Sequence, residues 1–118
     1  MAVVAMVLTV LIGLLHVYIL LMEMLWWETP RVRKVFGTDA DFAKRTKAMA
    51  ANQGLYNGFL AAGLFWGVWQ GAEGRDVVAF FLICVVVAGC YGAITVSKRI
   101  VFVQAMPAAL ALLALSVG

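Results

Sequence analysis

The stretch Asn52-Gln53-Gly54-Leu55-Tyr56-Asn57 decides how this chain folds. It places three amides and a phenol within a long apolar segment that runs from Ala48 to Gln70. A polar group left unpaired in hydrocarbon costs several kcal/mol, so these side chains need hydrogen-bond partners. The partners available lie in the other apolar segments. The stretch therefore predicts helices that pack around a shared polar layer.

The composition excludes an ordinary soluble domain. Of 118 residues, 65% are hydrophobic and 13% are charged, whereas soluble domains are about half apolar and about a quarter charged. We predict an integral membrane protein of the all-α class, an antiparallel four-helix transmembrane bundle that forms one domain over residues 1–118. Its helices are expected at about residues 3–27, 39–70, 76–96 and 100–117, where the apolar segments are long enough to cross about 30 Å of hydrocarbon.

The positions of the charges predict an orientation. Eight of the nine Lys and Arg residues lie between the first and second or between the third and fourth apolar segments, and only Arg75 lies between the middle pair. Cationic loops favour the cytoplasm. We expect a multi-pass protein of the bacterial cytoplasmic (inner) membrane, with both termini outside and the basic loops inside. Nucleic acid is not an expected partner, because the basic residues alternate with acidic ones and flank apolar helices.

The loop after the first apolar segment carries its own helix signals. Thr29 and Pro30 form a start and Gly37 a stop, which predicts a short interfacial helix over 30–36. Its Arg31, Arg33 and Lys34 side chains are expected to reach lipid headgroups. Membrane lipids are therefore expected partners.

A second helix start follows at once. Thr38-Asp39-Ala40-Asp41 has the spacing of a capping box, with Asp in place of the usual Glu or Gln. We predict that a helix begins here and continues without interruption into the second apolar segment.

Small residues recur every four positions in two series. These are Ala50, Gly54, Gly58 and Ala62, and then Gly63, Gly67 and Gly71. Such spacing lets helix backbones approach closely in a membrane. We expect one series to pack within the chain and the other to build a homo-oligomer, although glycine is also simply common in membrane helices.

Three further residues carry specific expectations. Pro107 is expected to bend the fourth helix and free carbonyl groups. Cys84 and Cys90 lie about 9 Å apart by helical rise, beyond disulfide reach, and are interpreted as buried thiols. With one histidine and no Cys/His ligand spacing, neither a metal nor another cofactor is expected.

Helical rise places the polar residues on two levels below the cytoplasmic surface. Glu23, Asn52, Gln53, Tyr91 and Gln104 come out about 6 to 8 Å deep, and His16, Tyr56 and Asn57 lie nearer the midplane. His16 and Glu23 share one helix face, being seven residues apart. A carboxylate in hydrocarbon is costly, so Glu23 should be protonated or held by donors such as Asn52, Gln53 and Tyr91.

These residues define a hypothetical pocket. Glu23 would be the acid or base and His16 its assistant in binding or modifying a small lipophilic molecule. The ligand would be oriented by Asn52, Gln53, Tyr56, Asn57, Tyr91 and Gln104. Two alternatives stay open: a small proton-coupled transporter that uses Glu23, and a structural bundle whose polar layer only fixes helix register.

Several runs carry a family resemblance. They are Leu15-His16-Val17-Tyr18, Asn52-Gln53-Gly54-Leu55-Tyr56-Asn57-Gly58 and Gln104-Ala105-Met106-Pro107-Ala108. Together they resemble the small integral-membrane proteins of domain-of-unknown-function family 1304, over essentially the whole chain. The resemblance implies a four-helix membrane protein and brings no activity.

Two weaker likenesses bear on function. Arg45, seven residues before Asn52, is similar to the start of the second helix in the membrane-associated proteins of eicosanoid and glutathione metabolism. Their following glutamate is replaced by Leu55, so glutathione binding is not implied. A glutamate in the first of four helices is similar to small multidrug resistance exporters, which however have shorter loops than residues 28–47.

Overall fold

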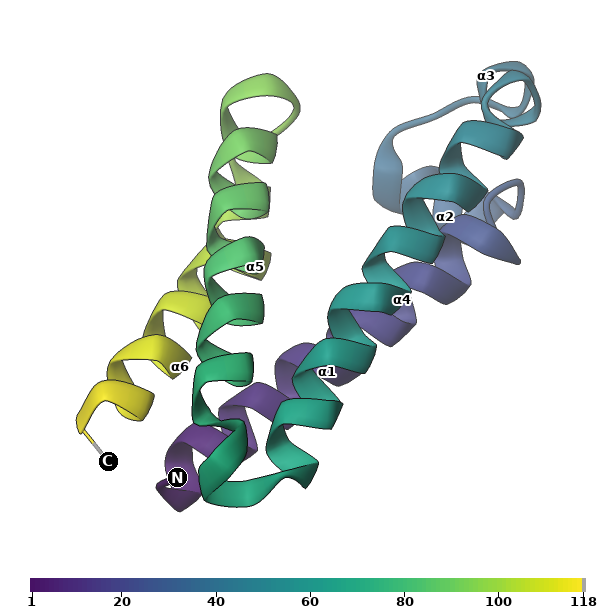
Figure 1. Ribbon diagram of the computed structural model, residues 1–118. Helices are drawn as coiled ribbons and strands as arrows, with labels where there is room; N and C mark the ends of the chain where they lie inside the picture. The colour runs from purple at the N-terminus through teal and green to yellow at the C-terminus, as the bar shows by residue number, and fades with distance from the viewer. Residues whose placement is uncertain (118) are drawn as a thin grey trace. The chain divides into compact units, whose positions relative to one another are not determined.

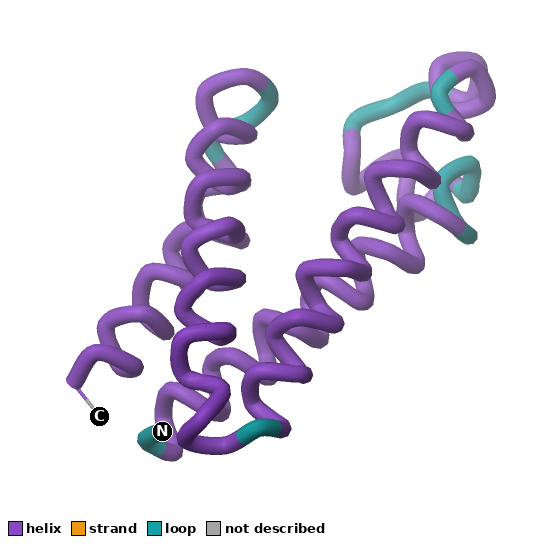
Figure 2. Tube along the Cα trace, in the orientation of Figure 1, coloured by secondary structure: helices purple, strands orange, loops and turns teal. Residues whose placement is uncertain are grey.

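The computed structural model describes residues 1–117, which form helices joined by short loops (Figures 1 and 2). This confirms the all-α class. In chain order the elements are α1 (Val3–Met24), α2 (Pro30–Phe36), α3 (Ala40–Arg45), α4 (Lys47–Trp69), the 3₁₀ turn η1 (Gly71–Gly74), α5 (Arg75–Thr95), the π-helix η2 (Val101–Ala105) and α6 (Met106–Val117). Four main helices, α1, α4, α5 and η2 with α6, occupy the four apolar segments.

Contacts divide the chain into two compact units. The first unit combines Met1–Leu14 with the chain from Leu60 onward, and the second is Leu15–Phe59. The first unit therefore holds α5, η2 and α6 together with one end each of α1 and α4. The second holds the remaining halves of α1 and α4 with α2 and α3, and it contains the stretch from Asn52 to Asn57.

Two helical stretches are long and apolar enough to cross a bilayer. They are α1, with 22 residues, and Gly71–Thr95, with 25 residues. The apolar stretch Val101–Val117 is shorter. Length and composition thus only weakly suggest membrane insertion, and four crossings stay a prediction.

The first unit has an aliphatic core to which α1, α4, α5 and α6 all contribute. Leu64 and Leu82 are fully buried, and Ala108 and Ala111 of α6 bury their methyl groups in the same cluster. Alanine on α6 lets α5 come close, and these two helices run side by side in Figure 1. Gly89 extends the close approach, since a Cβ there would lie 2.8 Å from the Ala105 backbone nitrogen.

The two small-residue series both meet neighbours within this chain. A Cβ on Gly54 would lie 2.7 Å from Met24 Cγ in the second unit. A Cβ on Gly67 would lie 2.6 Å from a Val78 methyl group in the first unit. Gly71 instead has φ 67° and no neighbour within 4 Å, so it serves the turn after α4. A homo-oligomer stays a prediction, and it would need a surface other than these close contacts.

The predicted caps of α2 are confirmed. Thr29 adopts an extended conformation and its hydroxyl accepts from the Val32 backbone N–H at 3.4 Å, with Pro30 at the first helical position. Gly37 closes the helix in the left-handed conformation with φ 69°. The helix buries Val32 against Ile19 and Met22 of α1.

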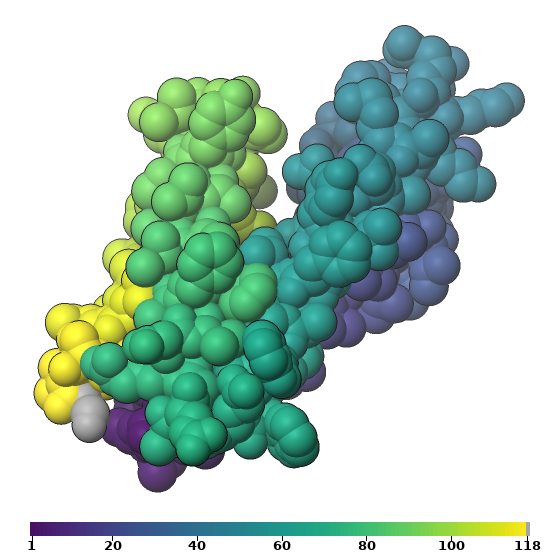
Figure 3. All heavy atoms as spheres, in the orientation of Figure 1, coloured from purple at the N-terminus to yellow at the C-terminus, as the bar shows by residue number. Residues whose placement is uncertain are grey.

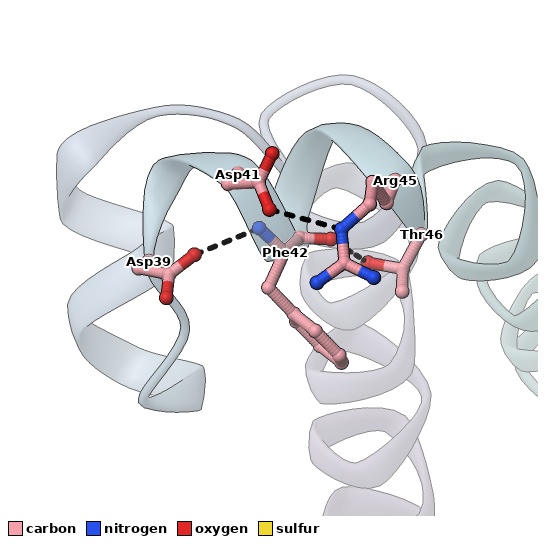
Figure 4. Close-up of polar contacts among 5 residues, drawn as sticks. All are labelled: Asp39, Asp41, Phe42, Arg45 and Thr46. Atoms are coloured by element: carbon pink, nitrogen blue, oxygen red, sulfur yellow. Dashed lines mark hydrogen bonds and ion pairs between the residues drawn. The ribbon is translucent and has the colours of Figure 1, made fainter.

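The prediction of an uninterrupted helix from residue 39 is wrong in two respects. The N-cap is Asp39 rather than Thr38, and its carboxylate accepts from the Phe42 N–H at 2.7 Å (Figure 4). The helix then breaks at Thr46, whose ψ of 9° interrupts the helical path between α3 and α4. The Thr46 hydroxyl donates to the Phe42 carbonyl at 2.7 Å, which stabilises the end of α3.

The fourth helix widens just before Pro107, and the bend expected at that residue stays a prediction. Residues Val101–Ala105 form a π-helix, and the Met106 N–H bonds to the Val101 carbonyl five residues back. Proline lacks the N–H that an α-helix needs, and a wider turn is one way to accommodate the loss.

Both cysteines are free thiols. Cys84 is half-buried, whereas Cys90 is exposed, so the prediction of burial is wrong for Cys90. Gly89 occupies the face of α5 that meets Ala105, and the next residue turns about 100° away from it.

Candidate functional site

Glu23 and Asn57 form the polar contact at the centre of the second unit. Glu23 lies at the end of α1 and is only 7% exposed. The Asn57 side-chain nitrogen Nδ2 donates to Glu23 Oε1 at 2.7 Å and also reaches the Gln53 backbone carbonyl at 3.2 Å. Among the described residues, Asn57 is the one donor to this carboxyl group. An amide thus holds a buried acidic side chain, and no basic side chain within residues 1–117 forms an ion pair with it.

Glycines in α4 create this contact. A Cβ on Gly54 would come within 3.0 Å of Glu23 Cβ and 3.2 Å of the Leu20 carbonyl oxygen. A Cβ on Gly58 would meet the Leu20 side chain at 2.5 Å. Leu20 thus faces Gly58 while Glu23 faces Gly54, as in an antiparallel pair. Without side chains at 54 and 58, the helices approach closely enough for Asn57 to reach Glu23.

His16 lies on the same buried side of α1. It is 1% exposed and precedes Glu23 by seven residues, so both side chains fall on one face. Thr9 continues the series of buried polar residues in the first unit, where its hydroxyl donates to the Ala5 carbonyl at 2.7 Å. Sequence reasoning missed Thr9, which hydrogen bonding within its own helix satisfies.

The other predicted ligand-binding residues are placed differently. Asn52, Gln53 and Tyr56 are exposed on α4, Tyr56 to 57%. Tyr91, which is 70% exposed, and the half-buried Gln104 belong to the first unit, on α5 and η2. The structure therefore joins Glu23 to Asn57 alone among the eight predicted site residues.

This corrects the expected partners of Glu23. Asn52, Gln53 and Tyr91 were predicted to hold the carboxyl group, with Asn57 on a deeper level beside His16. Rise along the helix sets depth only and says nothing of direction. Asn52 lies about 200° around the helix from Gly54, and Asn57 only about 60°. The angular position relative to the glycine series was the signal that selects Asn57.

Two further contacts fix the ends of α1 and α4. The Trp27 indole donates to the Thr46 hydroxyl at 3.1 Å, and its ring packs against Phe36 with centroids 4.9 Å apart. Lys47 Nζ lies 3.4 Å from Glu28 Oε1. Glu28 thus has the cation that Glu23 lacks.

Two surface hollows of the second unit lie away from Glu23. One, of about 280 Å³, is lined by Tyr18, Trp26, Thr29, Arg31 and Val32. The other, of about 390 Å³, is lined by Phe36, Gly37, Thr38, Asp39, Phe42 and Arg45, some of which appear in Figure 4. Neither includes Glu23 or Asn57, so a ligand pocket around that pair stays a prediction.

The three lipid-headgroup candidates also differ. Arg31 and Lys34 are exposed, whereas Arg33 is half-buried and its Nε atom is buried without a hydrogen-bond partner. The guanidinium and ammonium groups of Arg31 and Lys34 are therefore the ones open to an outside ligand.

The protein is an all-α bundle with long apolar helices and a buried carboxyl–amide pair. The chain belongs to the family described as "Protein of unknown function (DUF1304)", whose model matches residues 10–116. This confirms the resemblance found in the sequence. The chain is also similar to the "Uncharacterized protein YpaA" of Lactococcus lactis subsp. lactis (strain IL1403), with 27% identity over 115 residues, covering 96% of this chain and 97% of that protein. No solved structure matches the chain.

Proposed function

We propose that this protein spans a membrane and uses the Glu23–Asn57 pair to bind a small lipophilic molecule. The buried position of Glu23 beside a neutral amide carries the proposal. A carboxyl group in an apolar setting is costly, and such groups tend to serve binding, proton transfer or transport.

The exposed surface of the first unit supports the membrane placement. Phe80, Ile83, Val87, Tyr91 and Ile94 of α5 are all more than half exposed and recur every three or four residues. Large side chains are visible along α5 in Figure 3. An apolar stripe of this length is unfavourable in water and compatible with acyl chains. The same holds for Leu110, Leu113 and Val117 of α6.

The chemistry of the pair supports a polar but uncharged recognition element. Asn57 keeps one amide N–H on the carboxyl group and another on the Gln53 carbonyl. A ligand hydroxyl or amide could replace the Asn57 donor without leaving a buried polar atom unpaired. An otherwise apolar molecule with one hydrogen-bonding group fits this arrangement.

The experiment compares Glu23→Gln with Glu28→Gln. Both changes remove one carboxyl group from the same end of α1, but only Glu23 is buried, whereas Glu28 is exposed and lies beside Lys47. The full chain is purified in detergent, and its organic extract is analysed by mass spectrometry. We expect a small molecule that accompanies the wild type and the Glu28 variant and is lost from the Glu23 variant. Equal amounts in all three proteins would contradict the proposal.

Proton-coupled transport is the second candidate, favoured by the absence of a basic partner for Glu23 among the described residues. A carboxyl group held by a neutral amide can exchange a proton without breaking an ion pair. In proteoliposomes with an internal pH dye, added ethidium would then release protons in the wild type and not in Glu23→Gln. If Glu23→Gln instead unfolds the protein while Glu28→Gln does not, the carboxyl group is structural and both candidates fail.

A further inference from the structure

A hollow at the junction of α1 and α2 has an unusual combination of side chains. Tyr18 and Trp26 come from the end of α1 and the turn after it, and Thr29, Arg31 and Val32 from the start of α2. The hollow has a volume of about 280 Å³ and is lined mostly by apolar atoms. All five residues belong to the second unit.

Arg31 is the one charged residue that lines this hollow. Its guanidinium group has no hydrogen bond or ion pair with any other described residue, in contrast to Arg45, whose Nε bonds to Asp41 at 3.0 Å. No carboxylate lines the hollow. Arg31 therefore attracts an anion, and no acidic side chain in the lining pairs with a ligand's ammonium group. Arginine binds phosphate oxygens with paired N–H groups.

The neighbouring residues Trp26 and Trp27 have different surroundings. Trp27 uses its indole N–H on Thr46, whereas the Trp26 N–H has no acceptor among the residues described. Trp26 is 41% exposed and lines the hollow next to Arg31. Tryptophan and tyrosine favour the headgroup boundary of a bilayer, where an indole N–H can donate to an ester carbonyl.

The hollow is lined by both apolar and cationic groups. Tyr18 lies on α1, and Trp26 lies in the turn two residues after the end of that helix. Tyr18 and the buried Val32 present apolar surface, while Arg31 is exposed. The hollow thus combines one cationic group with apolar surface, as a phospholipid combines a phosphate with acyl chains.

We propose that this hollow binds one anionic phospholipid, with Arg31 holding its phosphate and Trp26 donating to an ester carbonyl. The first carbons of an acyl chain lie against Tyr18 and Val32. The absence of an acidic side chain in the lining favours an anionic headgroup over choline or ethanolamine, whose ammonium groups would meet Arg31. This assignment rests on the proposed membrane placement but not on a ligand at Glu23.

The test is native mass spectrometry of the full-length protein released from detergent with phosphatidylglycerol. Arg31→Gln is compared with Lys34→Gln, since both remove one exposed positive charge from α2 and only Arg31 lines the hollow. We expect about tenfold weaker binding for Arg31→Gln, the loss of one charge-assisted contact, and a change within about twofold for Lys34→Gln. Equal losses would indicate diffuse surface charge and overturn the site.

Two additional probes identify the ligand. Phosphatidylcholine should bind clearly more weakly than phosphatidylglycerol, and equal binding would overturn the anionic assignment. Millimolar inorganic phosphate should not displace phosphatidylglycerol, and displacement would point to a free-phosphate site instead.

Tryptophan fluorescence gives a readout that does not depend on the Arg31 variant folding. Brominated phosphatidylglycerol should quench the wild type more than Trp26→Phe, while Trp27→Phe should behave as the wild type. No difference between the two variants would overturn the placement of the lipid beside Trp26.

Carbonate washing of membranes separates the two proposals. A protein that stays in the membrane but shows no lipid selectivity contradicts the lipid site alone. A protein that is extracted contradicts the membrane placement.

Discussion

Asn57 and Asn52 are the same residue type on the same helix and have opposite surroundings. Asn57 donates to the buried Glu23 at 2.7 Å, whereas Asn52 is exposed. Removing the donor to a buried carboxyl group leaves that group unsatisfied, which costs about 1–3 kcal/mol and more if it is charged. Removing an exposed amide costs much less. Of these two asparagines, we therefore expect Asn57 to contribute much more to the stability of the fold.

We predict that Asn57→Leu lowers the free energy of unfolding by about 1–3 kcal/mol and that Asn52→Leu changes it by less than about 0.5 kcal/mol. Leucine has the same branching as asparagine and cannot form hydrogen bonds, and the same substitution at both positions separates the Glu23–Asn57 bond from the general effect of leucine. Thermal unfolding in detergent measures both variants. Similar losses for the two would mean that the Glu23–Asn57 bond contributes nothing beyond ordinary packing.

Helix caps could be predicted from the sequence, whereas the direction in which a side chain points toward another helix could not. Thr29, Pro30 and Gly37 mark α2 because each acts through its own backbone neighbours. Asn57 needs a partner 34 residues away in the chain, and its direction depends on which face of α4 meets α1. The depth of a residue below the membrane surface does not tell which way its side chain points around the helix.

The α5–η2 contact tests how closely the helices approach. A methyl group at Gly89 would lie 2.8 Å from the Ala105 backbone nitrogen, which cannot move without shifting the π-helix. A methyl group at Gly92 would lie 3.1 Å from the Ile100 side chain, which can adopt another rotamer. The two glycines lie one turn apart on the same helix.

We predict that Gly89→Ala destabilises the protein by about 1–3 kcal/mol because backbone must move. Gly92→Ala should be near neutral, because alanine's helix preference of about 1 kcal/mol offsets the adjustment of Ile100. Thermal unfolding of both variants under identical conditions checks the order. If Gly92→Ala were the more harmful change, the close approach at Ala105 would be wrong.

The start of α3 provides a second prediction at the scale of an element. Asp39 caps the helix through the Phe42 N–H, and Asp41 makes only an exposed ion pair with Arg45, 3.0 Å away. Asp39→Ala should cost about 1 kcal/mol and Asp41→Ala about 0.5 kcal/mol or less. Amide hydrogen exchange at Phe42 and Ala43 should rise only in the Asp39 variant. A rise at these amides in the Asp41 variant alone would contradict the assignment of Asp39 as the cap.

The helix breaks show why element boundaries were harder to predict than element identity. Nothing in Lys44-Arg45-Thr46-Lys47 forbids a continuous helix. The break depends on Thr46, whose hydroxyl donates to Phe42 within α3 and accepts the Trp27 indole from the end of α1. One of these partners is local, and the other is set by tertiary packing. Pro107 was recognisable as a disruption, but the π-helix before it also packs Ala105 against Gly89, a tertiary contact that the local sequence does not contain.

At the scale of the whole molecule, composition predicts the class and the charges predict the orientation. Helical character and the positions of the four apolar segments follow from long runs of apolar residues. The sequence could not show that both glycine series pack against helices of the same chain. A close-packing surface looks identical whether its partner is the same chain or a second copy. The orientation likewise depends on a membrane potential and an insertion process outside the folded chain.

The orientation can be tested with two matched alanines in a cysteine-free background carrying Cys84→Ala and Cys90→Ala. Ala40 and Ala72 are both exposed, and they lie in the two loop regions expected on opposite sides of the membrane. Because eight of the nine cationic residues flank the loops on the Ala40 side, we predict that a membrane-impermeant maleimide labels Ala72→Cys in intact cells. Ala40→Cys should react only after permeabilisation. Labelling of Ala40→Cys alone in intact cells would reverse the orientation and place Arg31 and its lipid hollow in the outer leaflet. Labelling of both residues would contradict a single orientation with the two sites on opposite sides of the membrane.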